Sequence, residues 1–520
     1  MSDSAERRSR ARLVVAVAIA GMIVRFVFAA LIPLFPDEAY YWEWSRHLAP
    51  GYFDHPPVIA LLIRGGTALL GATPFGVRLL SIVAGLVAAL CTAGIARRLA
   101  GDVGALRAVV VITCLPLAAA GLVLATPDAP LLAATAVGMY AVVRAVQSPP
   151  RSRASLLWWT AAGAALGVAF ASKYTSILLP VGVTIAVLAR PSLRVRLLEP
   201  GPYVACVVAT LVFLPVLVWN AQHDWISLGF QLRHGLGAPR RPDAWAPLKR
   251  LGDLLGGQAG LVSPILFVFL VAAAVRSLRK RASDSAFLLA VVATFAFLFF
   301  CVSATRQRVE ANWPAPAYIP AIALLGAVNW SARARAWLRA GVWLGGVLAA
   351  LIYLHAGFGL LPIPPRKDPV ARAAGWSQLA ARVTARASSW STPAAGGRTW
   401  LGADRYQDAS EIAFYASGRP TVFSMNLSGR GNQFDLWPRF PDRARPGDAL
   451  VLIVDESPQT HGTIVQLAPF FADVRRDELL PLRSRRGVVS ERRLWILRGW
   501  NGGWPSSEDS AAPSRSADRM

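Results

Sequence analysis

Long apolar runs limit how this chain can fold more than any other feature of its sequence. A run of about 20 apolar residues is needed to cross the hydrocarbon core of a bilayer, and runs near this length recur between residues 13 and 360. In lipid the backbone polar groups have no water to bond, so each run should be a helix. The sequence therefore predicts about eleven transmembrane helices. They lie near 13–33, 75–95, 106–124, 129–143, 154–171, 174–189, 203–219, 261–275, 286–302, 313–328 and 340–360.

The composition agrees with a membrane protein. Hydrophobic residues make up 54% of the chain and charged residues only 16%, which is too apolar for a purely soluble protein. The formal net charge of +24 would suggest nucleic-acid binding if it covered a soluble surface. Much of it lies in short loops between apolar runs, so we expect no nucleic-acid partner.

The positions of the basic residues predict an orientation. Cytoplasmic loops carry the excess of Lys and Arg, and every loop that would lie inside is basic if the N-terminus is cytoplasmic. The first apolar run is too long for a signal peptide and is interpreted as an uncleaved span. We expect a multi-pass protein of a bacterial inner membrane, with its C-terminus in the periplasm. The inside cations are Arg7, Arg8, Arg10, Arg12, Arg97, Arg98, Arg107, Arg151, Arg153, Arg190, Arg194, Arg196, Arg276, Arg279, Lys280, Arg281, Arg333, Arg335 and Arg339.

A change of composition at Pro362, Pro364 and Pro365 predicts a second domain. Short β-like segments alternate there with a helix-like one, which is typical of a small soluble α/β domain. The predicted organisation is a cytoplasmic segment 1–12, a transmembrane module 13–361, a periplasmic domain 362–504 and a disordered tail 505–520.

The first long outside segment carries the most informative acids. It reads PDEAYYWEW from Pro36, and then GYFDHPP from Gly51. Charged groups beside the hydrocarbon are costly and are usually kept for a task, so Asp37 is the candidate general base and Glu38 its neighbour in the site. The alternative is structural: Asp37 caps an interfacial helix, and the aromatic residues form a belt at the membrane surface.

Three motifs resemble those of glycosyltransferase family 39, which includes bacterial aminoarabinose transferases and protein O-mannosyltransferases. They are DEAYYWEW at 37–44, YFDHPP at 52–57 and TPDAPL at 126–131. The resemblance implies a GT-C membrane module with two juxtamembrane helices in the first outer loop, followed by an outward soluble domain. It also implies inverting transfer of a sugar from a polyprenyl-phosphate carrier, with no nucleotide cofactor.

This chemistry assigns roles to further residues. Asp128 matches an acid of the family's active-site cavity, although a simple turn would also explain it. If the acceptor is itself a phosphate, Asp37 would orient it and not act as a base. The departing phosphate needs cations in a poorly solvated site. The candidates are Lys173, Arg306, Arg308, His55 and Arg25.

Contact with lipid headgroups is the alternative for the first three cations. Arg25 lies within an apolar run, so it should pair with an acid or point into the cavity.

A divalent metal, zinc or else magnesium or manganese, is a further possibility. In the aminoarabinose transferases an acid and a basic residue before Pro-Pro help to bind metal and carrier phosphate, and the pair here is Asp54 with His55. The family member has Glu-Lys, so His55 departs from the pattern. Asp54, His223 and His234 are the candidate ligands, since imidazole and carboxylate suit such ions. Solvated loop histidines are the alternative.

The predicted activity is therefore sugar transfer from a polyprenyl phosphate to an envelope lipid, glycan or protein at the periplasmic face. A lipid or glycan transporter or flippase is the alternative from another class, but no inverted repeat relates the two halves of the chain. A structural envelope protein is the third hypothesis, and it would tolerate substitution of Asp37.

Overall fold

A computed structural model describes residues 3–236, 245–390, 397–427, 430–455 and 461–505, without the side chains of 3–5, 234–236 and 461. The chain forms two compact units. The first comprises Met1–Leu31 and Leu48–Leu354, and the second comprises Ile32–His47 and His355–Met520. The segment that contains Asp37 thus belongs to the second unit. The predicted domain limits did not anticipate this grouping.

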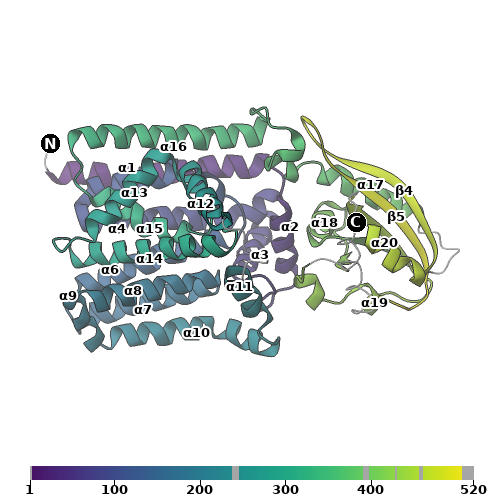
Figure 1. Ribbon diagram of the computed structural model, residues 1–520, viewed down its shortest axis with the longest axis horizontal. Coiled ribbons are helices and arrows are strands. Elements are labelled where there is room, and N and C mark those ends of the chain that lie inside the picture. The colour runs from purple at the N-terminus through teal and green to yellow at the C-terminus, as the bar shows by residue number, and fades with distance from the viewer. Residues whose placement is uncertain (1–2, 237–244, 391–396, 428–429, 456–460, 506–520) are drawn as a thin grey trace. The chain divides into compact units, whose positions relative to one another are not determined.

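All the secondary structure in the described part of the first unit is helical (Figure 1). Its helices are α1 (Asp3–Leu31), α3 (Val58–Leu70), α4 (Pro74–Cys114), α5 (Pro116–Gly121), α6 (Asp128–Gln147), α7 (Arg153–Phe170), α8 (Leu178–Ala189), α9 (Pro191–Arg194), α10 (Gly201–Gln222), α11 (Ile226–Leu236), α12 (Ala246–Val262), α13 (Pro264–Ser277), α14 (Asp284–Arg306), α15 (Ala315–Ala327) and α16 (Ala332–Phe358), the last of which continues into the second unit. Side-chain caps begin several of them: the Thr73 hydroxyl, for example, accepts from the Gly76 N–H before Pro74 starts α4.

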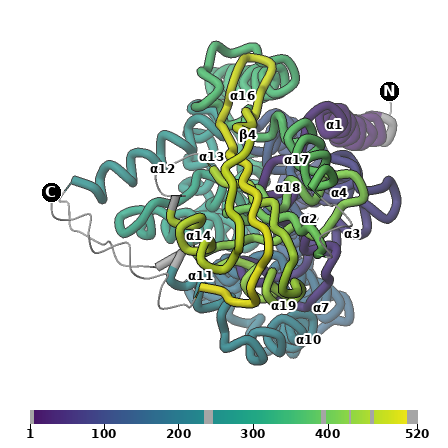
Figure 2. The backbone as a smooth tube through the Cα atoms, turned by 90° about the vertical axis from the view of Figure 1, so that its right-hand side faces the viewer, coloured from purple at the N-terminus to yellow at the C-terminus, as the bar shows by residue number. Residues whose placement is uncertain are grey.

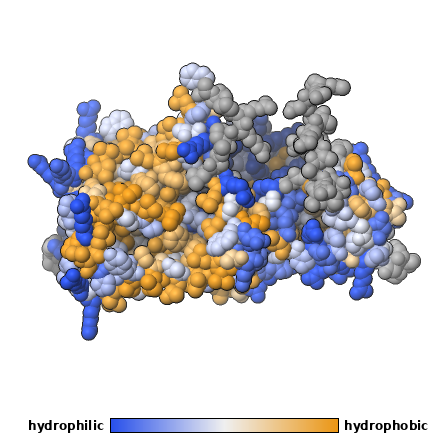
Figure 3. All heavy atoms as spheres, turned by 60° about the horizontal axis from the view of Figure 1, so that its bottom comes forward, coloured by the Kyte–Doolittle hydropathy of each residue, from blue (hydrophilic) through white to orange (hydrophobic). Residues whose placement is uncertain are grey.

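Six helices of the described chain are long and apolar enough to cross a membrane, and up to eight if each of two bent pairs is one span. Apolar residues cover the sides of these helices in Figure 3. The prediction of a polytopic helical membrane protein is confirmed, and a count of eleven spans stays a prediction.

Several expected runs are broken for local reasons. The run 106–124 is split at Leu115, because Pro116 cannot continue α4 and starts α5 instead. The run 261–275 bends by 103° between α12 and α13, where Ser263 has φ 75°. Gly101 lies between the expected runs 75–95 and 106–124, and it has φ 67°, a conformation that glycine adopts without strain. There α4 has a kink.

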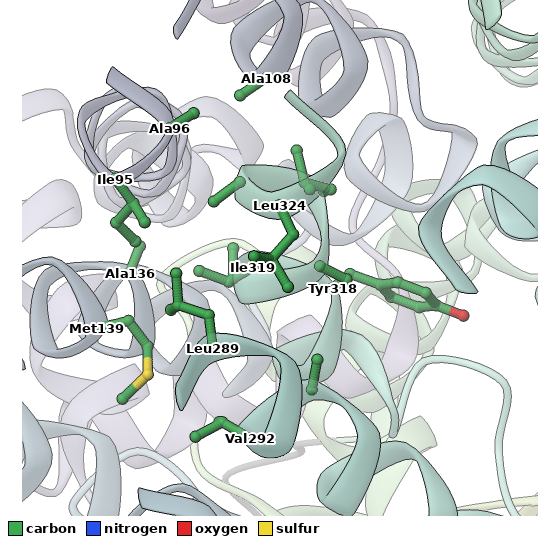
Figure 4. Close-up of a cluster of buried hydrophobic side chains, with 14 of the residues drawn as sticks. Ile95, Ala96, Ala108, Ala136, Met139, Leu289, Val292, Tyr318, Ile319 and Leu324 are labelled. Carbon is green, nitrogen blue, oxygen red and sulfur yellow. The ribbon is translucent and has the colours of Figure 1, made fainter. Parts of the chain in front are cut away.

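Small residues let the helices pack closely. A Cβ added to Gly163 of α7 would lie 2.3 Å from the Ala205 carbonyl oxygen of α10, as is usual where membrane helices meet. The main core joins α4, α6, α14 and α15 through side chains such as Ile95, Met139 and Ile319 (Figure 4).

The second unit contains a mixed sheet of order β2-β1-β3-β5-β4. Strands β1 (Thr399–Ala403), β2 (Val422–Ser424) and β3 (Ala449–Asp455) are parallel, and β4 (Phe471–Ser484) and β5 (Gly487–Trp500) add an antiparallel hairpin, yellow in Figure 2. The apolar run of β3 is buried on both faces, as expected for a central strand. The other elements are α2 (Pro36–Arg46), α17 (Trp376–Trp390), α18 (Tyr406–Tyr415), α19 (Phe440–Arg443) and α20 (His461–Leu467). The predicted C-terminal α/β domain is confirmed.

Candidate active site

The first unit contains a buried ion pair between two residues that the sequence analysis selected. The Lys173 ammonium lies 2.7 Å from Asp128 Oδ1, and each side chain is about 10% exposed. The other carboxylate oxygen, Oδ2, accepts a hydrogen bond of 2.6 Å from the Asn312 side-chain amide. Both oxygens of Asp128 are therefore satisfied, which a buried carboxylate requires.

Three separate segments bring these groups together. Asp128 begins α6 directly after Pro127, Lys173 lies in the hinge that follows α7, and Asn312 lies in the turn before α15. A second buried contact fixes that turn, because the Gln258 amide of α12 donates to the Ala311 carbonyl oxygen at 2.9 Å. The Tyr318 hydroxyl in turn donates to Gln258 Oε1 at 2.7 Å.

An apolar cavity of about 200 Å³ opens beside this cluster. Its wall comes from α4, α5, α6 and α15, and its few polar groups include Asp128, Asn312 and Thr126. A cavity with an apolar body and one polar edge suits a long-chain lipid whose charged end lies near the ion pair. A site role for Asp128 stays a prediction, as does the alternative of a simple turn.

The loop with the YFDHPP motif attaches to the same hinge. The N–H of Val58, just after Pro57, donates to the Ala171 carbonyl oxygen two residues before Lys173. The Asp54 carbonyl oxygen accepts from the Gln231 amide at 2.6 Å, and the Phe53 ring packs on Phe230 of α11. The structure thus holds Asp54 and His55 on a loop tied to the segment that carries Lys173.

In the second unit, the adjacent acids of α2 have different environments. The buried Glu38 carboxylate accepts from the Phe35 N–H at 3.0 Å and so caps the helix. Asp37 lies in the same first turn but is exposed. The cap predicted as the alternative role of Asp37 belongs to Glu38, and a role of Asp37 as general base stays a prediction.

The C-terminal chain holds α2 through contacts far apart in the sequence. The Gln433 N–H donates to the Tyr40 hydroxyl at 2.6 Å, and the Tyr40 ring lies 4.5 Å from that of Tyr406. The Trp42 ring meets Phe414 edge-on at 5.0 Å. The helix with Asp37 is therefore positioned by α18 and by the turn at 433–436.

Glu43 of α2 is a titratable group that the sequence analysis did not select. It is buried, and its carboxylate lies 2.9 Å from the Arg46 guanidinium. Burial raises the pKa of Glu43 to about 7, although Arg46 opposes the shift. Its protonation should therefore vary within the physiological pH range.

The remaining predicted cations lie elsewhere in the first unit. Arg306 and Arg308 are exposed, and Arg308 pairs with Glu310 at 3.1 Å. Arg25 is buried, and its guanidinium contacts the Tyr353 hydroxyl. The sequence analysis had expected an acid as a possible partner. That hydroxyl donates to the Ala119 carbonyl oxygen, so Arg25 links α1 to α16.

The described residues do not gather into a metal centre. No group of three His, Cys, Asp or Glu side chains within them could hold an ion. His223 stacks on the Trp219 ring at 4.1 Å, and its Nδ1 bonds the Trp219 carbonyl oxygen. The side chain of His234 lies outside the described residues. A metal held by Asp54 and the two histidines stays a prediction, and no step below runs through one.

The sequence is similar to that of known proteins over part of its length. Residues 54–219 match the family model described as dolichyl-phosphate-mannose-protein mannosyltransferase. This match covers less than half of the chain, and over that part it shows similarity to the family. Lipid A galacturonosyltransferase RgtD of Rhizobium johnstonii is 31% identical over 299 residues. That match covers 55% of this chain and 58% of the relative, so the chain spans little more than half of the relative's length.

Solved structures confirm the fold over nearly the whole chain. ArnT from Cupriavidus metallidurans bound to undecaprenyl phosphate has a TM-score of 0.63 at 17% identity, and covers 93% of this chain and 97% of its own. The apo form of ArnT has a TM-score of 0.62 at 18% identity, with the same coverage. The family model and the 31% identical relative confirm the resemblance to glycosyltransferase family 39 inferred from the motifs.

Sequence reasoning missed Asn312, Gln258 and Tyr318, which hold the turn beside Asp128. Asn312 stands next to Trp313 and Pro314 in a segment where only the cations had been considered. A half-buried amide that donates to a carboxylate far away in the sequence has no periodic sequence pattern. The one available signal was a polar residue directly before an apolar helix.

Proposed function

We propose that this protein is an inverting glycosyltransferase that moves a sugar from a polyprenyl-phosphate carrier to an envelope acceptor. The observation that carries the proposal is the Asp128–Lys173–Asn312 cluster at the polar edge of an apolar cavity. A buried ion pair is expensive to form, and within a membrane protein such a pair marks a working site. The family match over 54–219 includes both charged members of the cluster.

In the proposed reaction the acceptor oxygen attacks the anomeric carbon of the sugar. The bond from that carbon to the carrier phosphate breaks, and its electron pair stays on the phosphate oxygen. Asp37 takes the proton of an acceptor hydroxyl, or orients an acceptor that is already an ionised phosphate. Lys173 is placed to stabilise the negative charge that develops on the departing phosphate.

The relatives indicate which donor and acceptor to test first. ArnT binds undecaprenyl phosphate, and RgtD is named for transfer of galacturonic acid to lipid A. We therefore propose undecaprenyl phosphate as the carrier, and a glycolipid of the outer envelope as the first acceptor to try. The orientation from the basic loops would place this chemistry on the periplasmic face of the inner membrane, above a module of about eleven spans.

The test is release of undecaprenyl phosphate by the purified full-length protein in detergent. Extracts that contain undecaprenyl-phosphate-linked sugars and envelope lipids serve as donor and acceptor. Wild type should release the carrier phosphate, and Asp37→Asn should abolish release while keeping the melting temperature. Asp473→Asn is the matched control, because that acid lies on β4 and pairs with Arg475 at the surface. No release by folded wild type across the donor panel would overturn the proposal and favour transport.

A further inference from the structure

An open, strongly basic cleft lies in the first unit, away from the residues proposed for catalysis. It has a volume of about 1000 Å³ and lies among the start of α1, the break in α4 and the last turns of α6. Nothing in the proposed transfer reaction uses it. Its charged side chains are Glu6, Arg7, Arg10, Arg97, Arg98, Asp102 and Arg144.

The cleft has a surplus of positive charge even after its internal pairs are counted. Glu6 pairs with Arg10, and Arg97 Nε lies 2.7 Å from Asp102 Oδ1. Five arginines and two acids line the cleft, so positive charge remains in excess however they pair. An anionic ligand would therefore be attracted to the cleft.

Arg144 is held in position before any ligand arrives. Its guanidinium lies 4.3 Å from the centre of the Trp158 ring and donates to the Tyr140 hydroxyl at 3.0 Å. Arg98 is likewise fixed, because its Nε donates to the Gln147 side chain at 2.8 Å. Ordered arginines lose little conformational entropy on binding, and their planar donors match phosphate oxygens.

The position of the cleft along the helices indicates which kind of anion would bind there. The apolar part of α1 begins at Leu13, just after the cleft arginines, and Arg144 lies in the last turn of α6. Each of these helices is long and apolar enough to cross a membrane, so the arginines lie at the level of lipid headgroups. The apolar residues Leu90, Cys91 and Val103 complete the wall and could contact an acyl chain.

We infer that this cleft binds one phospholipid with an anionic phosphate headgroup. The headgroup lies between Arg98 and Arg144, and an acyl chain follows the apolar wall. Basic pockets between membrane helices are suited to such headgroups. The inference does not depend on the proposed glycosyl transfer.

Native mass spectrometry of the full-length protein tests the inference, with phosphatidylglycerol, cardiolipin and phosphatidylcholine as the lipids added. Wild type should retain one anionic lipid through detergent stripping and little phosphatidylcholine. The double variant Arg98→Gln/Arg144→Gln should bind the anionic lipid about tenfold or more weakly, since each arginine near a lipid surface contributes about 1 kcal/mol. The matched control Arg279→Gln/Arg281→Gln removes the same charge from another basic loop and should bind as wild type does.

Three results would overturn the inference. Equal loss of lipid in the control would mean that the general charge of the basic loops attracts it. Unchanged retention by Arg98→Gln/Arg144→Gln would exclude the cleft as the site. Displacement of the lipid by millimolar inorganic phosphate would indicate a site for soluble anions. Melting temperatures separate loss of lipid from loss of fold, and Arg98→Gln alone, which keeps the Arg144 stack on Trp158, gives the answer if the double variant does not fold.

Discussion

The buried pair of Asp128 and Lys173 can be tested by a double-mutant cycle. Lys173→Met keeps most of the side-chain volume but removes the cation beside the buried Asp128 carboxylate. The hydrogen bond from the Asn312 amide to Asp128 Oδ2 remains. Removing one partner of a buried pair costs about 3–5 kcal/mol, because the remaining charge is uncompensated. The melting temperature should therefore fall by roughly 5–10 °C.

The double variant Asp128→Asn/Lys173→Met removes both charges. A neutral amide at position 128 can still bond Asn312, and no charge is left buried, so stability should return to within about 1 kcal/mol of wild type. Carrier-phosphate release should not return, because the cation proposed to stabilise the leaving group is absent.

The assay pairs thermal unfolding in one detergent with release of undecaprenyl phosphate from the same preparations. Arg382→Met is the control, since its pair with Glu478 is exposed and should contribute less than about 1 kcal/mol. If the double variant regained both stability and activity, the pair would be structural and the proposed role of Lys173 would be wrong. If Lys173→Met were as stable as wild type, the inference of an uncompensated buried charge would be refuted.

Three further predictions concern α2, the second unit and the metal. Tyr40→Phe removes the acceptor of the Gln433 N–H, so hydrogen exchange in α2 should rise and release of carrier phosphate should slow. The control Tyr203→Phe loses a surface hydrogen bond to the Leu197 carbonyl oxygen and should change neither. Unchanged exchange in Tyr40→Phe would show that this bond does not position α2. Burial, with Asp408 adding to it, raises the pKa of Asp404 to about 7, so its ionisation destabilises the fold as pH rises from about 4 to 7. Asp404→Asn can still accept from the Asp455 N–H, and it should raise the melting temperature at pH 8 but not at pH 4.5. An equal rise in melting temperature at both pH values would show that ionisation of Asp404 is not its cause. His223→Gln should leave release of carrier phosphate unchanged, because Trp219 already holds the His223 ring. The metal site would instead be supported if a chelator abolished release by both proteins and added zinc then restored it in the wild type but not in the variant.

Much of the architecture could be predicted because it rests on local patterns. The length of the apolar runs predicts membrane helices, and the alternating segments after Pro365 predict the α/β domain. The breaks were harder to predict. Ser263 bends the chain by 103° between α12 and α13, yet it is a single residue inside a sequence that is apolar on both sides.

The grouping of α2 with the second unit could not be predicted from the sequence. It depends on Tyr40 meeting the backbone of Gln433, which is 393 residues away along the chain. Contacts of such long range leave no periodic signal, and the aromatic residues of α2 fit a membrane belt equally well. The same limit hid Asn312, which reaches Asp128 across 184 residues.

The two adjacent acids of α2 show how the structure separates hypotheses that the sequence left open. An acid at the start of a helix has two possible roles, to cap it or to act on a ligand, and the sequence left both open for Asp37, with Glu38 as its neighbour in the site. The Phe35 N–H selects Glu38 as the cap, so neutralising Glu38 should loosen the start of the helix. Asp37 does not make that bond and is exposed, so Asp37→Asn should leave the cap of the helix in place. Loss of transfer in Asp37→Asn without loss of α2 would then have a chemical cause.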